Sequence, residues 1–339
     1  MTLKENFLKA LNGETVDKVP VLSVTQTGIT ELMDLVGAEW PQAHTDAQKM
    51  ADLAVAAHEI AGLEAVRLPY CLTVLAEAMG CSVNMGTKNR QPSVTEHPYE
   101  RPETLDSITI PDLVTAGRIP TVLEAVRIAR TKIGPDVPII AGMEGPVTLA
   151  SDMVGVRSFM KWSIKKPEAL QKVLAAATDA AIRYADLLAD AGADVICIAD
   201  PVCSPDLMSP QDFRDKLMGS IVRFADNVRV PVILHVCGNV TAIIKDMADC
   251  HCKGLSIEEK VQDLAGAKKE IAGKAVIIGN ISSPFVLLSD ESPDSEKVRE
   301  AAAAALRNGV DILAPGCGIA PMTPLKNIKA MVKARNDFC

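Results

Sequence analysis

Aromatic residues are scarce in this 339-residue chain, where Phe, Trp and Tyr together make up 3%. A core of ordinary size must therefore be built from aliphatic side chains, and the apolar fraction of 48% is sufficient for one. No stretch of 18 uncharged apolar residues occurs, which argues against a transmembrane helix. Low-complexity tracts are also missing, so extended disorder is not expected.

Basic residues are not in excess. Lys and Arg number 35 against 43 Asp and Glu, and the net charge of −8 disfavours partners such as nucleic acids or anionic membranes. The first residues, Met-Thr-Leu-Lys-Glu-Asn, contain no apolar signal-peptide core. Nine cysteines in such a chain predict a reducing, cytoplasmic location, where cysteines are more often buried, metal-binding or catalytic than paired in disulfides.

Short β-branched runs alternate with long Ala- and Leu-rich helical stretches along most of the chain. Such alternation predicts parallel βαβ units, and eight units favour a closed (β/α)₈ TIM barrel; an open doubly wound sheet is the alternative. The eight predicted strands are Val19–Val24, Ala65–Pro69, Pro138–Gly142, Asp194–Ala199, Pro231–Val236, Gly254–Ile257, Ala275–Gly279 and Asp311–Ala314. The clearest predicted helices are Pro167–Ala191, Pro210–Asn227, Val261–Ala272 and Ser292–Asn308.

Two segments fall outside the regular alternation. Met1–Thr15 predicts an N-terminal helix outside the barrel, and residues 70–137 form a long insertion between the second and third strands. The insertion contains a hairpin-like stretch, Cys81–Tyr99. With no linker and no fixed-period repeat, we expect one elaborated domain over residues 1–339.

Three potential metal ligands are predicted at the mouth of this barrel. His235 and Cys237 are two residues apart at the end of the fifth strand, so their side chains point the same way. Cys317 follows the eighth strand in a Pro-Gly-Cys-Gly turn. Active sites of such barrels lie at this C-terminal end, and one imidazole with two thiols suits Zn²⁺ with one open position. A buried histidine beside two inert thiols is the alternative interpretation.

A fourth ligand is expected from the sixth strand. Glu258 is the better candidate because Glu259 leads into a polar helix start, although either carboxylate could instead cap a helix or face solvent. Cys203, after the fourth strand, is a reserve ligand, and Cys197 is expected in the core. The string from Asp249 to Cys252 contains Asp, Cys, His and Cys but precedes a strand, which predicts a structural role at the opposite face.

Polar side chains at four further strand ends predict a rim that could receive a small ligand. Asp200 is assigned, with Glu258, to catalysis. Glu144, Asn280 and Arg67 are assigned to substrate binding, and the guanidinium fork of Arg67 could meet an anionic group. For each of these side chains a buried structural role, or for Arg67 a salt bridge across the barrel top, remains the alternative.

Several motifs carry a resemblance to the uroporphyrinogen decarboxylase superfamily over nearly the whole chain. They are Gly145–Ala150, Gly279–Pro284, Ala314–Ile319 and Pro324–Asn327. Within that superfamily the chain is similar to the zinc-dependent methylcobamide:coenzyme M methyltransferases of methanogenic archaea. The stretches Ser23–Gly28 and Thr87–Val94 look closest to the methanol-pathway member.

This resemblance implies a (β/α)₈ barrel with zinc on His235, Cys237 and Cys317, and with Glu258 as the fourth ligand when the thiol substrate is absent. It implies transfer of a methyl group from a methylcobamide to the thiol of coenzyme M. It also implies a separate corrinoid protein as partner. The chain has no complete Asp-x-His-x-x-Gly cobalamin signature, because Ile233 occupies the Asp position before His235 and Gly238.

Other functions are left open by the sequence. A metal-free decarboxylase-like lyase is disfavoured because its Arg-Gln-Ala-Gly-Arg type of stretch corresponds here to Thr25–Ile29, which has no basic residue. A non-catalytic corrinoid-binding module is disfavoured by the incomplete cobalamin signature. The methylamine-pathway homologue and a similar enzyme with a different methyl acceptor, such as homocysteine, remain alternatives.

Overall fold

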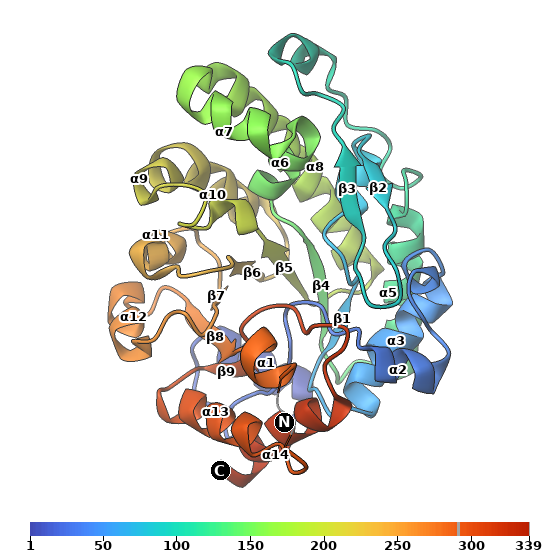
Figure 1. Cartoon of the computed structure of the whole chain (residues 1–339), viewed down its shortest axis with the longest axis vertical. Helices are drawn as coiled ribbons and strands as arrows, with labels where there is room; N and C mark the ends of the chain where they lie inside the picture. Colours follow the sequence, from blue (N-terminus) through green and yellow to red (C-terminus); the bar gives the residue numbers. More distant parts are fainter. Residues whose placement is uncertain (290–291, 339) are drawn as a thin grey trace.

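Seven parallel strands form the central sheet of the computed structural model, which describes residues 1–289 and 292–338. The sheet curves around a common centre with helices outside it (Figure 1). The strands, in their spatial order, are β1 (Val66–Leu68), β4 (Ile139–Glu144), β5 (Val195–Ala199), β6 (Val232–His235), β7 (Gly254–Ser256), β8 (Val276–Ile281) and β9 (Ile312–Pro315). They match the last seven predicted strands.

The first predicted strand, Val19–Val24, is reduced to a single parallel bridge between Val21 and Leu313 of β9. Leu313 donates its backbone N–H to the Pro20 carbonyl at 2.9 Å, and Leu22 donates to the Leu313 carbonyl at 3.1 Å. The Val21 carbonyl accepts from Glu64, just before β1, at 2.9 Å. Pro20 has no N–H to extend the ladder. This short segment nevertheless joins β9 to the β1 side, which closes the predicted (β/α)₈ barrel.

Helix α1 (Leu3–Leu11) closes the N-terminal end of the barrel. Its Phe7, Ala10 and Leu11 belong to the apolar cluster that fills the interior, which also contains Ile233 and Ile278. This helix is shorter at both ends than the predicted Met1–Thr15, because a capping box formed by Thr2 and Glu5 starts it and Asn12 is its C-cap. With this end closed, the C-terminal mouth is the way into the barrel.

The outer helices agree with the predicted pattern, with differences at their ends. Helix α8 (Pro167–Ala191) has the predicted bounds. The predicted helix Pro210–Asn227 is one helical run in three parts, with a π-helical turn η4 (Phe213–Leu217) between α9 (Pro210–Asp212) and α10 (Met218–Asn227). Helices α12 (Leu264–Ile271) and α13 (Glu296–Arg307) start later than predicted, α12 because Asp263 caps it.

The remaining helical elements lie before, between and after these units. They are α2 (Thr30–Val36), η1 (Gln42–His44), α3 (Ala47–Glu59), α4 (Val74–Ala78), η2 (Pro102–Ser107), α5 (Ile119–Ile133), α6 (Pro146–Val154), α7 (Val156–Lys165), η3 (Pro201–Cys203), η5 (Thr241–Ile243), α11 (Ile244–Ala248), η6 (Ser283–Leu287) and α14 (Leu325–Phe338).

The insertion contains the predicted hairpin, formed by β2 (Ser82–Asn84) and β3 (Ser93–Glu96) in antiparallel pairing. At the base of the hairpin, His97 Nδ1 lies 2.6 Å from the carbonyl oxygen of Asp152 in α6. At its tip, Lys88 forms ion pairs with Asp34 of α2 and with Glu39. The hairpin thus connects α6 to α2 along one side of the molecule (Figure 1).

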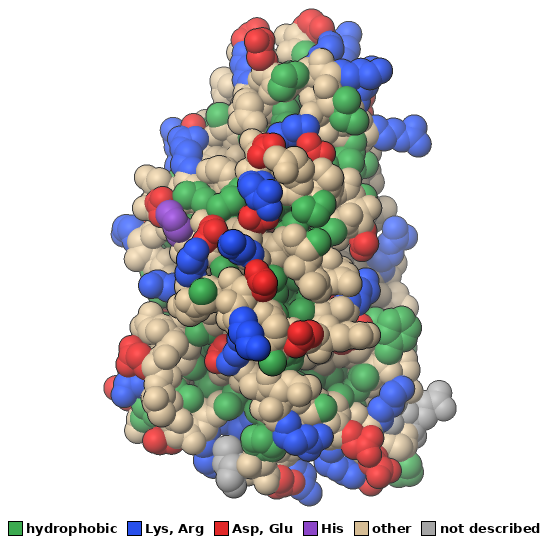
Figure 2. Space-filling view, turned by 90° about the vertical axis from the view of Figure 1, so that its left-hand side faces the viewer, with side chains coloured by type: hydrophobic (Ala, Val, Ile, Leu, Met, Phe, Trp, Pro, Cys, Tyr) green, Lys and Arg blue, Asp and Glu red, His purple; other side chains and the backbone are tan. Residues whose placement is uncertain are grey.

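Basic and acidic side chains are interspersed on the face shown in Figure 2. Ion pairs between charged side chains include those between Arg214 and Asp246 and between Lys274 and Asp249. No helix in the described part of the chain is long and apolar enough to cross a membrane.

Candidate metal centre at the barrel mouth

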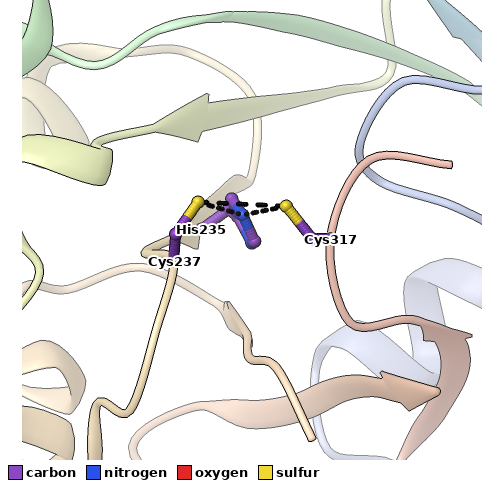
Figure 3. A group of neighbouring side chains, drawn as sticks. All are labelled: His235, Cys237 and Cys317. Carbon is purple, nitrogen blue, oxygen red and sulfur yellow. Dashed lines mark hydrogen bonds between the residues drawn. The ribbon is translucent and has the colours of Figure 1, made fainter. Parts of the chain in front are cut away.

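One imidazole and two thiols converge at the C-terminal end of the barrel. His235 is the last residue of β6, Cys237 lies two residues further on, and Cys317 lies two residues beyond the end of β9. The separations are 3.3 Å from Cys237 Sγ to His235 Nε2, 3.6 Å from Cys317 Sγ to the same nitrogen, and 3.9 Å between the sulfurs. Figure 3 shows both thiols directed toward the imidazole from opposite sides.

These separations fit a tetrahedral metal ion. Zinc bonds of about 2.3 Å to sulfur and about 2.0–2.1 Å to nitrogen place two sulfurs about 3.8 Å apart and a sulfur about 3.6 Å from a nitrogen. The three observed separations lie within a few tenths of an ångström of these values. No other group of three or more potential ligands lies this close together in residues 1–289 and 292–338. The donor set therefore suits Zn²⁺ in both chemistry and size.

Ser256 orients the imidazole. The β6–β7 register pairs His235 with Ser256, and the Ser256 hydroxyl oxygen lies 3.0 Å from His235 Nδ1. Ser256 is fully buried, and His235 is 2% exposed. A partner at Nδ1 leaves Nε2 free to face the sulfurs, as in metal sites where the second ring nitrogen donates a hydrogen bond. Our sequence analysis missed Ser256, although it lies two residues before Glu258 and strand alternation directs both to the same face.

The turn that carries Cys317 is held in place by close backbone packing. Gly316 donates its N–H to the Ile281 carbonyl at 2.7 Å, and a Cβ at this position would lie 3.0 Å from the Cα of Glu258. Ser283 donates its hydroxyl to the Cys317 carbonyl at 3.1 Å. The Pro-Gly-Cys-Gly motif therefore lets β9 approach β7 and β8 closely enough to bring Cys317 to the end of β6.

Without a metal ion, the three side chains compete for protons. The hydrogen bond between Cys237 and Cys317 lowers the pKa of Cys317, although burial opposes this effect. The interaction with His235 lowers the pKa of Cys317 further. The same sulfur–sulfur hydrogen bond and burial raise the pKa of Cys237. Burial lowers the pKa of His235, but the interactions with Cys317 and Glu258 outweigh it and raise the pKa overall. A metal ion that binds to these side chains must displace the protons that they carry.

Glu258 lies beside this group without being part of it. Its charge acts on both His235 and Cys237, but its carboxylate oxygen Oε2 pairs with Lys260 Nζ at 3.4 Å. The Glu258 side chain is 12% exposed, whereas that of Lys260 is 49% exposed. The predicted fourth ligand is therefore next to the three others, and it has a flexible partner at the mouth.

Two of the predicted rim carboxylates hold helix N-termini. Asp200 accepts a hydrogen bond from the Thr148 N–H of α6 at 2.7 Å, and Glu144 accepts one from the Ala76 N–H of α4 at 3.2 Å. Both side chains are fully buried. Burial raises the pKa of Asp200 to about 6 against the opposing hydrogen bonds from Thr148, and it also raises the pKa of Glu144. This geometry favours helix capping for Asp200 over the catalytic role predicted for it.

Asn280 points away from the three ligands. Its amide donates to the Val261 carbonyl at 3.3 Å, and it lines a groove between α12 and α13 on the outside of the barrel. Strand alternation from Ile278, an interior residue, predicts the opposite direction. The structure therefore does not bring Asn280 to the predicted binding site.

The other candidate cysteines are also separate from the cluster. Cys203, Cys250 and Cys252 are buried and free, and burial raises the pKa of each. His251 instead pairs with Asp226 on the surface at 2.8 Å. This arrangement agrees with the structural role expected for the segment from Asp249 to Cys252.

The comparisons with known proteins agree with this architecture. The family model described as Uroporphyrinogen decarboxylase (URO-D) matches residues 2–338. The chain belongs to this family. It is 60% identical over 338 residues to the protein named Methylcobamide:CoM methyltransferase MtaA from Methanosarcina barkeri, covering 99% of this chain and 98% of that protein. It is 35% identical to Methylcobamide:CoM methyltransferase MtbA from Methanosarcina acetivorans, covering 99% and 98%.

A solved structure is also similar to this family member. It is titled methyltransferase from Methanosarcina mazei and shares 60% sequence identity. The superposition has a TM-score of 0.96 and covers 100% of this chain and 99% of the other. Within the URO-D family, the chain therefore groups with the methylcobamide:CoM methyltransferases.

Removing either thiol should remove the metal from this URO-D family member. We expect Cys237→Ala and Cys317→Ala to lower bound zinc well below about one per chain, because two remaining donors hold a tetrahedral ion poorly. Elemental analysis by mass spectrometry checks the zinc content. Cys203→Ala is the matched control, since this buried thiol lies outside the cluster and its loss should leave zinc unchanged. Full zinc retention in either test variant would remove that cysteine from the ligand set.

Ser256→Ala should weaken zinc binding while leaving all three donors in place. Loss of the hydroxyl at Nδ1 is expected to lower zinc affinity about 10- to 100-fold, because the imidazole loses its orienting partner. Competition with a chromophoric chelator measures this change. The buried hydroxyl of Ser163 bonds within α7, and Ser163→Ala is a control that should not alter zinc affinity. An affinity unchanged by Ser256→Ala would show that Ser256 does not orient the ligand.

Asp152 of α6, a carboxyl group near Glu144 and Asp200, should make the free energy of unfolding depend on pH. Burial and the charges of Glu144 and Asp200 raise its pKa to about 8. An unfolded Asp ionises near pH 3.9, so between about pH 4 and pH 8 the unfolded state loses a proton that the folded state keeps. The free energy of unfolding therefore falls over this range, and Asp152→Asn should remove that fall.

We expect Asp152→Asn to be more stable than the parent protein at pH 8, by at least about 1.4 kcal/mol, which corresponds to one pKa unit. The gain should be smaller at pH 5. Urea unfolding at the two pH values measures the difference. An equal effect at both pH values would contradict the raised pKa.

Proposed function

We propose that this protein is a zinc-dependent methyltransferase that moves a methyl group from a protein-bound methylcobamide to the thiol of coenzyme M. The observation that carries the proposal is the close set of His235, Cys237 and Cys317 at the open end of the barrel. This set lies in a chain that is 60% identical to a protein named as a methylcobamide:CoM methyltransferase. A metal-free lyase would have no use for an imidazole and two thiols held at tetrahedral distances.

Zinc, when bound, would supply the Lewis acidity that deprotonates the thiol of coenzyme M, which carries little thiolate at neutral pH on its own. The two cysteine thiolates of this chain would cancel the charge of the ion. The substrate sulfur would then keep its electron density and remain nucleophilic, which a set of neutral histidine ligands would not favour to the same degree.

The methyl transfer itself needs only substrate bonds to change. The thiol of coenzyme M loses its proton to solvent at the mouth, its sulfur forms a bond to the methyl carbon, and the cobalt–carbon bond breaks. The electron pair of that bond leaves with cobalt, giving cob(I)amide and methyl-coenzyme M. His235 and Cys237 from one strand, and Cys317 from another, would hold the zinc ion to which the substrate sulfur binds.

Glu258 is proposed to occupy the fourth position until the thiol replaces it. Its neighbour Lys260, at 3.4 Å, is placed to receive the carboxylate once it is displaced. A carboxylate in this position would keep water, a competing ligand and nucleophile, away from the site. The displacement needs only a side-chain movement, because Glu258 follows the end of β7 and faces the mouth.

The methyl group is proposed to come from methanol by way of a separate methylated corrinoid protein. The relatives that share about 60% identity carry the name of the methanol-type enzyme, MtaA, whereas MtbA relatives share 35% and 36%. The corrinoid protein would dock at the mouth. We place the reaction in the cytoplasm, since all eight cysteines in the described ranges are free. Transfer from a methanol-specific corrinoid protein should be faster than from a methylamine-specific one.

X-ray absorption at the zinc edge, with and without coenzyme M, tests the central claim. We expect about one zinc per chain and one additional sulfur ligand when the thiol is added. An assay of methylcobalamin demethylation that depends on coenzyme M then measures activity. If protein that was prepared without chelators binds no zinc, the proposed mechanism is wrong. A metal-free lyase of the same family would then be favoured.

Glu258→Gln should weaken zinc binding more without coenzyme M than with it, because the thiol replaces the carboxylate in the complex. Chelator competition in both states measures the difference. Glu259→Gln is the control, since Glu259 bonds to Ser282 and lines the outer groove. If Glu258→Gln abolishes methyl transfer with zinc and thiol both bound, Glu258 is instead a proton-transfer or positioning residue.

A further inference from the structure

Arg67 is a buried cation inside the barrel. It lies in the middle of β1 and is 3% exposed. Its guanidinium reaches across to Gly142 of the neighbouring strand β4, where a Cβ would collide with Nη2. The glycine therefore provides the space in which this side chain lies flat against the barrel wall.

The strand register places this guanidinium below the metal ligands. Gly142 pairs with Cys197 of β5, and Cys197 pairs with Ile233 of β6. Ile233 lies two residues before His235 on the same strand, which is about 6–7 Å along the strand direction. The Arg67 guanidinium thus lies in the barrel interior, about two residues along the strand below His235, and we call this level the floor of the mouth.

Arg67 has no acidic partner in the part of the chain that the structure describes. Its Nε donates to the Val24 carbonyl at 3.2 Å, and its Nη1 donates to the Pro69 carbonyl. The other two buried arginines differ, because Arg118 pairs with Glu77 and Arg335 pairs with Glu64. A buried charge that is neutralised only by carbonyl dipoles is costly for a protein to retain without a function.

The groups around Arg67 do not supply the missing negative charge. Cys197 is the largest charge interaction that opposes the effect of burial on the pKa of Arg67, but burial raises the pKa of the Cys197 thiol to about 12. This thiol is therefore neutral at physiological pH. Glu144, two residues beyond Gly142, accepts its hydrogen bond from α4, and burial raises its pKa as well.

We propose that Arg67 binds the sulfonate of coenzyme M while the thiol of the same molecule faces His235, Cys237 and Cys317. The inference rests on the proposed function for the identity of the thiol. An anionic group would compensate the buried charge, and the planar guanidinium suits the oxygens of a sulfonate. The two-carbon linker of coenzyme M would then set the distance between floor and metal. Arg67 would be the residue that selects this thiol over uncharged ones.

Substitution of Arg67 should separate coenzyme M from a thiol that lacks the sulfonate. In Arg67→Met, kcat/KM for coenzyme M should fall about 10- to 100-fold, mainly through KM, because charge-assisted hydrogen bonds are lost. With 2-mercaptoethanol as acceptor, kcat/KM should remain within about threefold of the parent. This thiol has no sulfonate, so the substitution removes no charge-assisted hydrogen bond to it. Arg67→Lys should restore part of the coenzyme M activity. An equal loss for both thiols, with zinc retained, would overturn the proposal.

Gly142→Ala offers a second variant that keeps the charge. The added methyl would displace the guanidinium from its place on the wall, and the backbone of Gly142 does not require glycine for a positive φ. We expect a higher KM for coenzyme M and little change for 2-mercaptoethanol. Arg130→Met is the matched control, because Arg130 bonds to carbonyls and to Asp194 at the start of β5, at the opposite end of the barrel.

Binding of ethanesulfonate gives a measurement that does not depend on catalysis. This anion has no thiol, so its binding should not need the metal ligands. It should raise the melting temperature of the zinc-loaded parent protein and of Arg130→Met but not of Arg67→Met. Stabilisation of Arg67→Met to the same extent would place the anion elsewhere. Absence of zinc and of methyl transfer to either thiol in the parent would instead count against the proposed function.

Discussion

Closure of the barrel is the constraint on which the site depends. Three strand-to-strand steps separate β6 from β9, which in a flat sheet would be about 14 Å. The sulfurs of Cys237 and Cys317 are nevertheless 3.9 Å apart. They meet because the sheet curls until residues 20–22 connect β9 to the β1 side, so that the side chains at the strand ends point toward a common axis. A doubly wound sheet with the same strands would leave the ligands apart.

Electrostatics then distinguish the groups that gather at this mouth. Glu144 and Asp200 each accept a hydrogen bond from the N-terminal turn of a helix, α4 for Glu144 and α6 for Asp200, so they stabilise the wall. The imidazole and the two thiols contact one another, and Ser256 contacts the imidazole, an arrangement that suits a tetrahedral metal ion. Within the described residues, Arg67 has neither a carboxylate nor a helix end as partner. This buried cation lies inside the barrel below the three potential metal ligands.

This arrangement gives a simple account of how a small bifunctional thiol would be oriented. One end of the molecule would be held by charge on the floor of the mouth, and the other by the donors of β6 and the turn after β9. The open face above them is left for the methyl donor. The fit of such a substrate would depend on strands β1, β4 and β6 and on the closely packed turn that carries Cys317, which suits a reaction that needs a sulfur and a methyl carbon in line.

The strand alternation, seven of the eight strands, the hairpin of the insertion and the grouping of His235, Cys237 and Cys317 could all be predicted from the sequence. These features depend on local periodicity and on the end of the strand at which a residue lies. Other features depend on contacts between distant segments. The register between β6 and β7 pairs Ser256 with His235, and packing against Val261 turns Asn280 outward. Glu144 and Asp200 accept hydrogen bonds from the N-terminal turns of α4 and α6. Gly142 has no side chain, which leaves space for the guanidinium of Arg67. Each of these outcomes depends on a neighbour far away in the chain, which no local pattern encodes.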